Sequence, residues 1–245
     1  MQIYMPFILT MIAGLSTLFG LIFIYIKNDY KIIKNSLAFA SGVMICISVI
    51  DLIPESIILL NKDLSKNISF IYLVLFIILG LIIPLIIDKL LNKDKEKLYK
   101  LGLLSMIAII LHNLPEGIIT FLSAQTNIKL GFKMTIAIAL HNIPEGISIA
   151  VPIYYSTKNK FKAFIMTLLS ALSEPVGGVV AFLFLKPIIN NIIMGIIFAI
   201  IAGIMTCISL VELLPKALEY KNKNKTLLLF LIGIIFMIIS IKLLN

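Results

Sequence analysis

The chain has 245 residues, of which 60% are hydrophobic and only 13% are charged, and its mean hydropathy is +1.11. A soluble domain of this length would carry about a quarter charged residues and under half apolar ones. The composition therefore excludes a soluble protein and predicts one polytopic membrane domain over 1–245. The net charge of +9 does not indicate a nucleic-acid partner, because the basic residues are all lysines spread over polar loops.

Eight apolar stretches follow one another along the chain, each long enough to cross a hydrocarbon core of roughly 30 Å as a helix. Short loops rich in Lys, Asn and Asp join them. We expect membrane-spanning helices at 4–26, 36–60, 68–91, 101–125, 130–154, 162–185, 189–215 and 226–244. The predicted fold class is an all-α membrane protein with eight transmembrane helices, surrounded by membrane lipid.

Lysines are distributed unequally between two sets of loops. The loops after the first, third, fifth and seventh helices carry 15 of the 21 lysines, and the other loops and the C-terminus carry 6. Positively charged loops tend to remain on the cytoplasmic side of a membrane. We therefore expect the loops after the odd-numbered helices inside the cell and both termini outside it.

The two ends of the chain resemble each other. Residues 41–56 align without gaps with residues 202–217, and seven of these 16 positions are identical. The first helix aligns more weakly with the sixth, at Leu15/Leu172, Ser16/Ser173 and Gly20/Gly177. Because the matching helices are five apart, an odd offset, the repeated units would be inverted across the membrane. The pattern predicts inverted repeats, helices 1–3 and 6–8, around a central pair of helices 4 and 5, as in secondary transporters.

The hexapeptide His-Asn-Leu-Pro-Glu-Gly at 112–117 recurs as His-Asn-Ile-Pro-Glu-Gly at 141–146, and these copies hold the only two histidines of the chain. A His and a Glu four residues apart share one face of a helix. Imidazole nitrogens and carboxylate oxygens are ligands for divalent transition metals, and the neighbouring Asn offers an amide oxygen. The candidate ligands are His112, Asn113, Glu116, His141, Asn142 and Glu145.

A third acidic residue, Glu174, also precedes a proline inside an apolar stretch. An acidic residue at the centre of a spanning helix costs about 2.5–3.5 kcal/mol. No lysine lies deep enough in a helix to neutralise Glu116, Glu145 and Glu174, so protonation, water or a cation must offset their charge. Pro115 and Pro144 lack an N–H, and we expect each to kink its helix and to free a carbonyl for a cavity.

Four further residues are weaker candidates, for which packing or a position at the water interface explains the sequence equally well. They are Asp51, Glu55 and Glu212, near the ends of the second and seventh helices, and Met44, a soft thioether. The three acidic residues could shape the path by which a cation reaches or leaves the central site.

The two hexapeptides and the segment Ala-Leu-Ser-Glu-Pro-Val-Gly-Gly at 171–178 resemble the ZIP family of divalent metal transporters, and the resemblance covers the whole chain. It implies uptake of Zn²⁺, Fe²⁺ and other divalent cations, among them Mn²⁺, Co²⁺ and Cd²⁺, across a bacterial cell membrane into the cytoplasm. It also implies a binuclear site bridged by Glu116 and Glu145. The first metal would take His112, Glu116, His141 and Glu145, with Met44 as a weaker addition. The second metal would take Asn113, Glu116, Asn142, Glu145 and Glu174.

Two departures from the family pattern have consequences. The loop at 92–100 is short and lacks the histidines that many members carry there, so we do not expect that loop to sense cytoplasmic metal. Asp51 stands where many relatives have a histidine, which would alter affinity or selectivity on the way to the site.

Other classes of protein remain in competition with a transporter. An intramembrane zinc metalloenzyme would also hold metal in the membrane, but the chain lacks the His-Glu-x-x-His motif of zinc proteases. A structural or signalling membrane protein has no use for three buried carboxylates. A homodimer is compatible with the sequence, which does not determine the oligomeric state.

Overall fold

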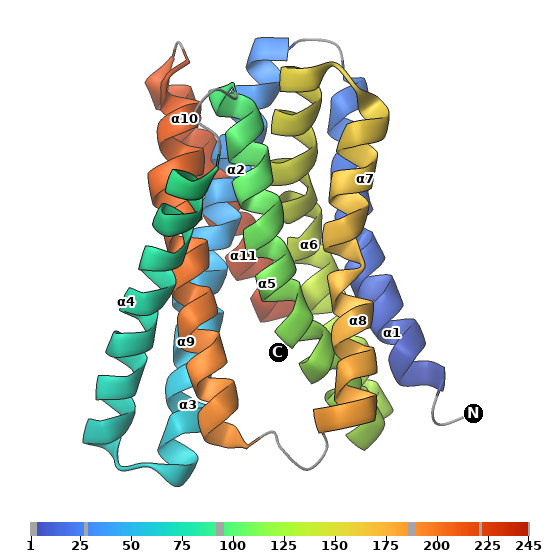
Figure 1. The fold of residues 1–245 in the computed structure, drawn as a ribbon, viewed down its shortest axis with the longest axis vertical. Coiled ribbons are helices and arrows are strands. Elements are labelled where there is room, and N and C mark those ends of the chain that lie inside the picture. Colours follow the sequence, from blue (N-terminus) through green and yellow to red (C-terminus); the bar gives the residue numbers. More distant parts are fainter. Residues whose placement is uncertain (1–3, 27–28, 92–95, 186–189, 221, 245) are drawn as a thin grey trace.

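The computed structural model describes residues 4–26, 29–91, 96–185, 190–220 and 222–244, and it is helical throughout these ranges apart from short connections. The described residues form eight helical spans long and apolar enough to cross a membrane, which confirms the predicted fold class. Spans one to eight are Tyr4–Tyr25, Lys31–Asp63, Lys66–Leu90, Lys97–Thr126, Ile128–Thr157, Lys160–Leu183, Asn191–Leu218 and Lys223–Lys242. The helices run side by side along the long axis of the molecule (Figure 1).

Several spans reach further into the polar loops than the hydropathy pattern predicts. Span four, helix α5 (Lys97–Thr126), begins at Lys97 instead of residue 101, and span five, helix α6 (Ile128–Thr157), ends at Thr157 instead of residue 154. Lysine side chains can extend their ammonium groups into water while their backbone continues a helix. Of the lysines that decided the predicted orientation, Lys27, Lys93, Lys95, Lys186 and Lys221 lie outside the described residues.

Span one changes its helical type halfway along. Helix α1 (Tyr4–Leu15) continues directly into a 3₁₀ segment, η1 (Ser16–Tyr25). A 3₁₀ run of ten residues is unusually long, since such runs seldom exceed three or four residues. The narrower 3₁₀ segment packs against α6, with Gly20 next to the backbone of Gly146.

Spans two and seven are each interrupted by a π-helical turn, which the sequence did not predict. Span two is built from α2 (Asp29–Ile47), η2 (Ser48–Leu52) and α3 (Ile53–Asp63), and span seven from α9 (Asn191–Cys207), η4 (Ile208–Leu213) and α10 (Leu214–Leu218).

The two π turns lie at positions that the sequence repeat aligns. The Ile53 N–H donates to the Ser48 carbonyl, five residues earlier, and the Leu214 N–H donates to the Ser209 carbonyl in the same way. A proline, Pro54 or Pro215, follows immediately. A proline ring crowds the carbonyl four residues before it, and a wider turn relieves that contact. Pro115 and Pro144 differ, because α5 and α6 each continue through their proline as one helix of 30 residues.

Spans four, five and seven are the most buried of the eight. In their apolar windows, 67%, 72% and 67% of the residues are buried, against 17% for α4 (Lys66–Leu90) and 22% for span eight, whose helix is α11 (Lys223–Leu244). Spans four and five also pack against each other as a pair. Exposed Ile, Leu and Phe side chains cover the outer faces of α4 and α11. The outer spans therefore present the surface suited to lipid, and the inner pair is shielded from it.

Contacts between helices divide the described spans into two bundles. Spans one, four, five and six pack together as the first bundle, and spans two, three, seven and eight as the second. Span six consists of α7 (Lys160–Ala171), α8 (Ser173–Val180) and η3 (Ala181–Leu185). In Figure 1, α1, α6, α7 and α8 lie on one side of the molecule and α3, α4, α9 and α10 on the other.

Glycines that match in the sequence repeats make matching contacts. A Cβ on Gly117 of α5 would lie 1.9 Å from the Glu174 carbonyl oxygen, and a Cβ on Gly146 of α6 would lie 1.9 Å from the Thr17 carbonyl oxygen. Glu174 and Thr17 occupy the same place in the alignment of span six with span one. These contacts are those expected of repeated units. The inversion of the units across the membrane stays a prediction.

We predict that Gly117→Ala destabilises the protein, because the new methyl group meets backbone that cannot rotate away. Overpacking of this kind costs about 1–3 kcal/mol. The unfolding temperature of the detergent-solubilised protein should fall, followed with a thiol-reactive dye that reports exposure of the buried Cys46 and Cys207. Gly178→Ala is the matched control, since its nearest neighbour is the Thr10 hydroxyl at 3.2 Å. Equal unfolding temperatures for the two variants would contradict the prediction.

Candidate metal centre

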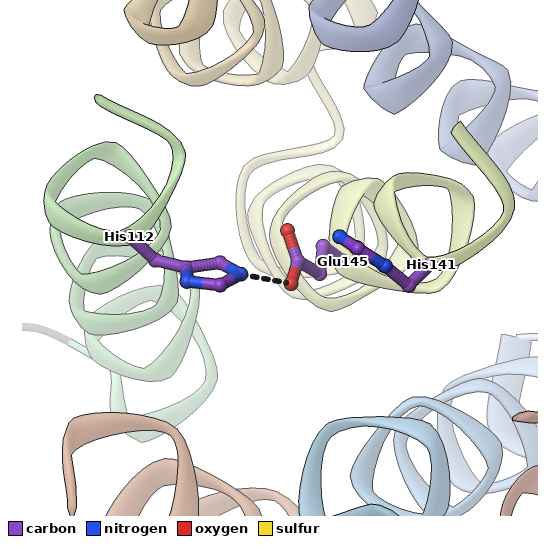
Figure 2. A group of neighbouring side chains, drawn as sticks. All are labelled: His112, His141 and Glu145. Atoms are coloured by element: carbon purple, nitrogen blue, oxygen red, sulfur yellow. Dashed lines mark ion pairs between the residues drawn. The ribbon is translucent and has the colours of Figure 1, made fainter. Parts of the chain in front are cut away.

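The two hexapeptides meet in the middle of α5 and α6, where the chain is most deeply buried. His112 and Glu145 are inaccessible to solvent, and His141 and Glu116 are 3% and 6% exposed. Figure 2 shows the His112 imidazole from α5 directed at the Glu145 carboxylate of α6, with His141 beside it. The repeated sequence thus brings its two copies together as one cluster.

Distances within the cluster place each carboxylate beside an imidazole. His112 Nε2 lies 3.3 Å from Glu116 Oε1 and 3.4 Å from Glu145 Oε1. His141 Nε2 lies 3.2 Å from Glu116 Oε1. Ligand atoms of His112, His141 and Glu145 all lie within 4.8 Å of one another, close enough to share one metal ion.

Apart from the ion-pair contacts of His112 at 3.3 and 3.4 Å, several ligand atoms in this region have no hydrogen-bond partner among the described residues. They are both ring nitrogens of His112, Asn142 Oδ1, Glu145 Oε1 and Glu174 Oε2. A buried polar atom left unsatisfied costs about 1–3 kcal/mol. Imidazole nitrogen and carboxylate oxygen are donors that suit Zn²⁺ and related divalent cations. The chemistry and the unsatisfied state of these atoms therefore fit a divalent metal ion.

Asn142 and Glu174 form a second set next to the first. Asn142 Nδ2 donates to Glu174 Oε1 and to the Ala13 carbonyl oxygen at 3.0 Å, and both side chains are fully buried. This hydrogen-bonded group joins α6 to α8 of span six and to α1 of span one. Ala13 was not a predicted site residue, because a backbone carbonyl gives no signal in a side-chain pattern.

Asn113 completes the set of seven predicted residues. With its amide oriented to satisfy its neighbours, Asn113 Nδ2 donates to the Ile109 carbonyl at 3.2 Å and to Glu145 Oε2 at 3.3 Å. One oxygen of Glu145 thus faces His112 and the other faces Asn113.

A cavity of about 460 Å³, which we call the vestibule, reaches the cluster from the end of the molecule where α5 ends and α6 begins. Glu116 and His141 line its inner part, and Asp51 and Glu55 line its wall on η2 and α3. It lies between the two bundles. Other lining residues were not predicted from the sequence, namely Ser123, Met134, Met194 and Met237. Of these, Ser123 and Met134 carried a signal, since Ser123 lies seven residues after Glu116 and Met134 lies seven residues before His141, each pair on one helical face.

Glu212 lies in a separate cleft of about 270 Å³ near the opposite end, which Asp88, Lys97 and Lys100 also line. There Lys100 Nζ contacts Asp88 Oδ1 at 2.7 Å and links α5 of the first bundle to α4 of the second. Met44 is fully buried in the hydrophobic core between the bundles, where Ile47, Ala108, Val151 and Met205 also lie.

The architecture and the cluster together are those of a multi-pass membrane protein with a buried set of metal-type ligands in its two central helices.

Comparison with known proteins agrees with this class. The family model described as "ZIP Zinc transporter" matches residues 92–241, more than half of the chain. A zinc transporter ZupT from Streptococcus mutans is 39% identical over 259 aligned positions, which cover 99% of this chain and 98% of the relative. A ZupT from Chlorobaculum parvum is 37% identical with the same coverage, and one from Campylobacter jejuni is 34% identical over all of this chain and 98% of its own. The chain belongs to the ZIP zinc transporter family, whose members are transporters and not enzymes, so the metalloenzyme alternative is wrong.

We predict that His141→Ala weakens zinc binding by the purified, detergent-solubilised protein by about 10–100-fold, the range seen when a group that supports a metal site is lost. The vestibule exposes His141 to an arriving ion, and its loss leaves one imidazole. Isothermal titration with Zn²⁺ measures the effect. Asn127→Ala, which removes a polar side chain from the exposed start of α6, is the control and should bind as wild type. An unchanged affinity in His141→Ala would remove that residue from the site.

Proposed function

We propose that this chain carries Zn²⁺, and with it Fe²⁺ and other divalent cations, across a bacterial cell membrane into the cytoplasm through a binuclear site. The observation that carries the proposal is the cluster at His112, Glu116, His141 and Glu145. Its ligand atoms are buried mid-span, several of them lack a hydrogen-bond partner among the described residues, and the vestibule reaches two of its members. The ZupT relatives are zinc transporters, which supports zinc as the cargo.

The division into two metals follows from the two oxygens of each bridging carboxylate. Glu145 Oε1 lies beside His112 and Glu145 Oε2 beside Asn113, so a cation on either side finds one oxygen of the same carboxylate. The first metal takes His112, Glu116, His141 and Glu145. The second takes Asn113, Glu116, Asn142, Glu145 and Glu174. Two divalent cations would offset the charge of three acidic groups in an apolar surrounding.

Transport requires that the site open to each side of the membrane in turn. The vestibule leads to the cluster from one end between the two bundles, whereas at the other end a cleft stops short of it. Leu101 lines the cleft, and further along α5 the buried apolar Ala108 precedes His112 by one helical turn. We propose that movement of one bundle against the other closes the vestibule and opens the cleft, with separation of the Lys100–Asp88 ion pair.

The direction of uptake follows from the predicted orientation. With the lysine-rich loops inside the cell, the vestibule faces outward and Asp51 and Glu55 meet the cation first. The cleft at Glu212 then faces the cytoplasm. Carboxylates along the wall of the vestibule raise the local concentration of cations.

We predict that Glu116→Ala and Glu145→Ala each abolish zinc uptake into proteoliposomes while the protein is still made and inserted. Each carboxylate serves both metals, so its loss removes a ligand from both and a compensating charge from the site. Uptake of radioactive zinc, normalised to inserted protein, measures the effect. Asp63→Ala changes an exposed acidic residue at the end of α3, outside both the vestibule and the cleft, and should leave uptake unchanged. Wild-type uptake by either correctly inserted site variant would contradict the proposal of a binuclear site.

We also predict that Asn142→Asp shifts the preference among Zn²⁺, Fe²⁺ and Mn²⁺ without ending zinc transport. The change adds negative charge only at the second metal, and harder oxygen ligands favour Fe²⁺ and Mn²⁺ over Zn²⁺. Competition of each metal against radioactive zinc uptake provides the readout. Asn127→Asp is the matched control, because an aspartate caps the start of α6 as an asparagine does. Identical competition profiles for wild type and Asn142→Asp would show that Asn142 does not contact metal.

A further inference from the structure

A group of lysines and tyrosines surrounds the turn between α6 and α7, at the upper end of the first bundle in Figure 1. Lys160 Nζ lies 4.2 Å from the centre of the Tyr25 ring, and Lys162 Nζ lies 4.3 Å from the centre of the Tyr99 ring. Lys158 Nζ lies 4.9 Å from the Tyr155 ring centre. The lysines of one short turn thus reach aromatic rings on spans one, four and five.

The backbone of this turn is unusual at Lys158. Lys158 ends α6 with φ 54°, in the left-handed region, where glycine is the usual residue. Asn159 follows and caps α7 by accepting a hydrogen bond from the Lys162 N–H at 2.9 Å. Only these two residues separate the helices. Lys158, Lys160 and Lys162 are therefore displayed around one tight turn, at a backbone cost that a glycine at 158 would avoid.

Exposed aromatic side chains lie among these lysines. Phe161, between Lys160 and Lys162, is 71% exposed, and Tyr25 is 66% exposed. The segment 157–164 carries no acidic residue. Exposed aromatic rings beside lysines at the end of a membrane span are typical of the interface between acyl chains and headgroups.

The chemistry of the group fits a phosphate ester. A cation–π contact holds an ammonium over a ring. On Lys160 and Lys162 it still leaves N–H donors of the three for an anion on the outer side. A cluster of basic residues next to a membrane span attracts anionic lipid. The exposed Phe161 and Tyr25 favour a phosphate that arrives attached to a lipid over one free in water.

We propose that Lys160, Lys162, Tyr25 and Phe161 form a binding site for the headgroup of an anionic phospholipid in the leaflet at this end of the molecule. The site is separate from the metal centre, and its occupant does not depend on the proposed direction of transport. Because its residues come from spans one and six, a bound lipid would tie the first bundle to that leaflet.

The test compares phosphatidylglycerol with phosphatidylcholine on the full-length protein in detergent, with bound lipid counted by native mass spectrometry. Wild type should prefer phosphatidylglycerol. In the double variant Lys160→Gln/Lys162→Gln, the ratio of bound phosphatidylglycerol to bound phosphatidylcholine should fall by about fivefold for each lysine removed. This factor corresponds to the attraction of one lysine to an anionic surface. Lys160→Arg/Lys162→Arg should keep it, since charge and donors remain.

The control removes the same charge elsewhere. Lys129→Gln/Lys133→Gln changes two exposed lysines at the other end of α6 and should bind phosphatidylglycerol as wild type does. Inorganic phosphate, added in excess, should not displace the lipid. Wild-type preference in Lys160→Gln/Lys162→Gln would overturn the proposal. So would an equal loss in Lys129→Gln/Lys133→Gln, or displacement by inorganic phosphate.

Discussion

The structure depends on one electrostatic constraint, which is that three carboxylates lie in the apolar interior of a membrane span without a lysine beside them. Glu116, Glu145 and Glu174 are at most 6% exposed. Charge in such surroundings is costly unless an opposite charge accompanies it. The two imidazoles and two amides gathered around these groups donate or accept hydrogen bonds but supply no fixed positive charge. In the proposed function, a divalent cation supplies that charge while it passes through the site.

Close contact between helices is what allows so many polar groups to share one small volume. Gly117 and Gly146, the last residues of the two hexapeptides, let the backbones of spans six and one approach α5 and α6 until a methyl group would not fit. Those contacts bring Glu174 and the Ala13 carbonyl next to Asn142. The glycine of each motif therefore contributes to the site by allowing close helix packing, although it offers no ligand atom.

The π turns of spans two and seven lie where the two bundles face each other. The π turn at Ser48–Leu52 places Asp51 in the wall of the vestibule, and the turn at Ile208–Leu213 places Glu212 in the opposite cleft. A mid-helix π turn frequently marks a functional position. The two acidic residues that occupy matching places in the sequence repeat thus line two separate cavities, one towards each end of the molecule. In both spans the carboxylate is carried by the π turn itself.

The sequence by itself determined the class of fold and the eight spans, and it supplied the seven residues of the proposed site, because hydropathy and a duplicated motif are local patterns that can be recognised without coordinates. The four-residue spacing of His112 and Glu116 likewise predicted that the two side chains share one face of a helix. Only the tertiary structure decided which side chains lie next to one another. Glu145 lies between His112 and Asn113. Asp51 lines the vestibule, whereas Met44 packs in the hydrophobic core. The tertiary structure also decided where the helices depart from α geometry. These features depend on contacts between spans far apart in the chain, and helical periodicity carries no information about them.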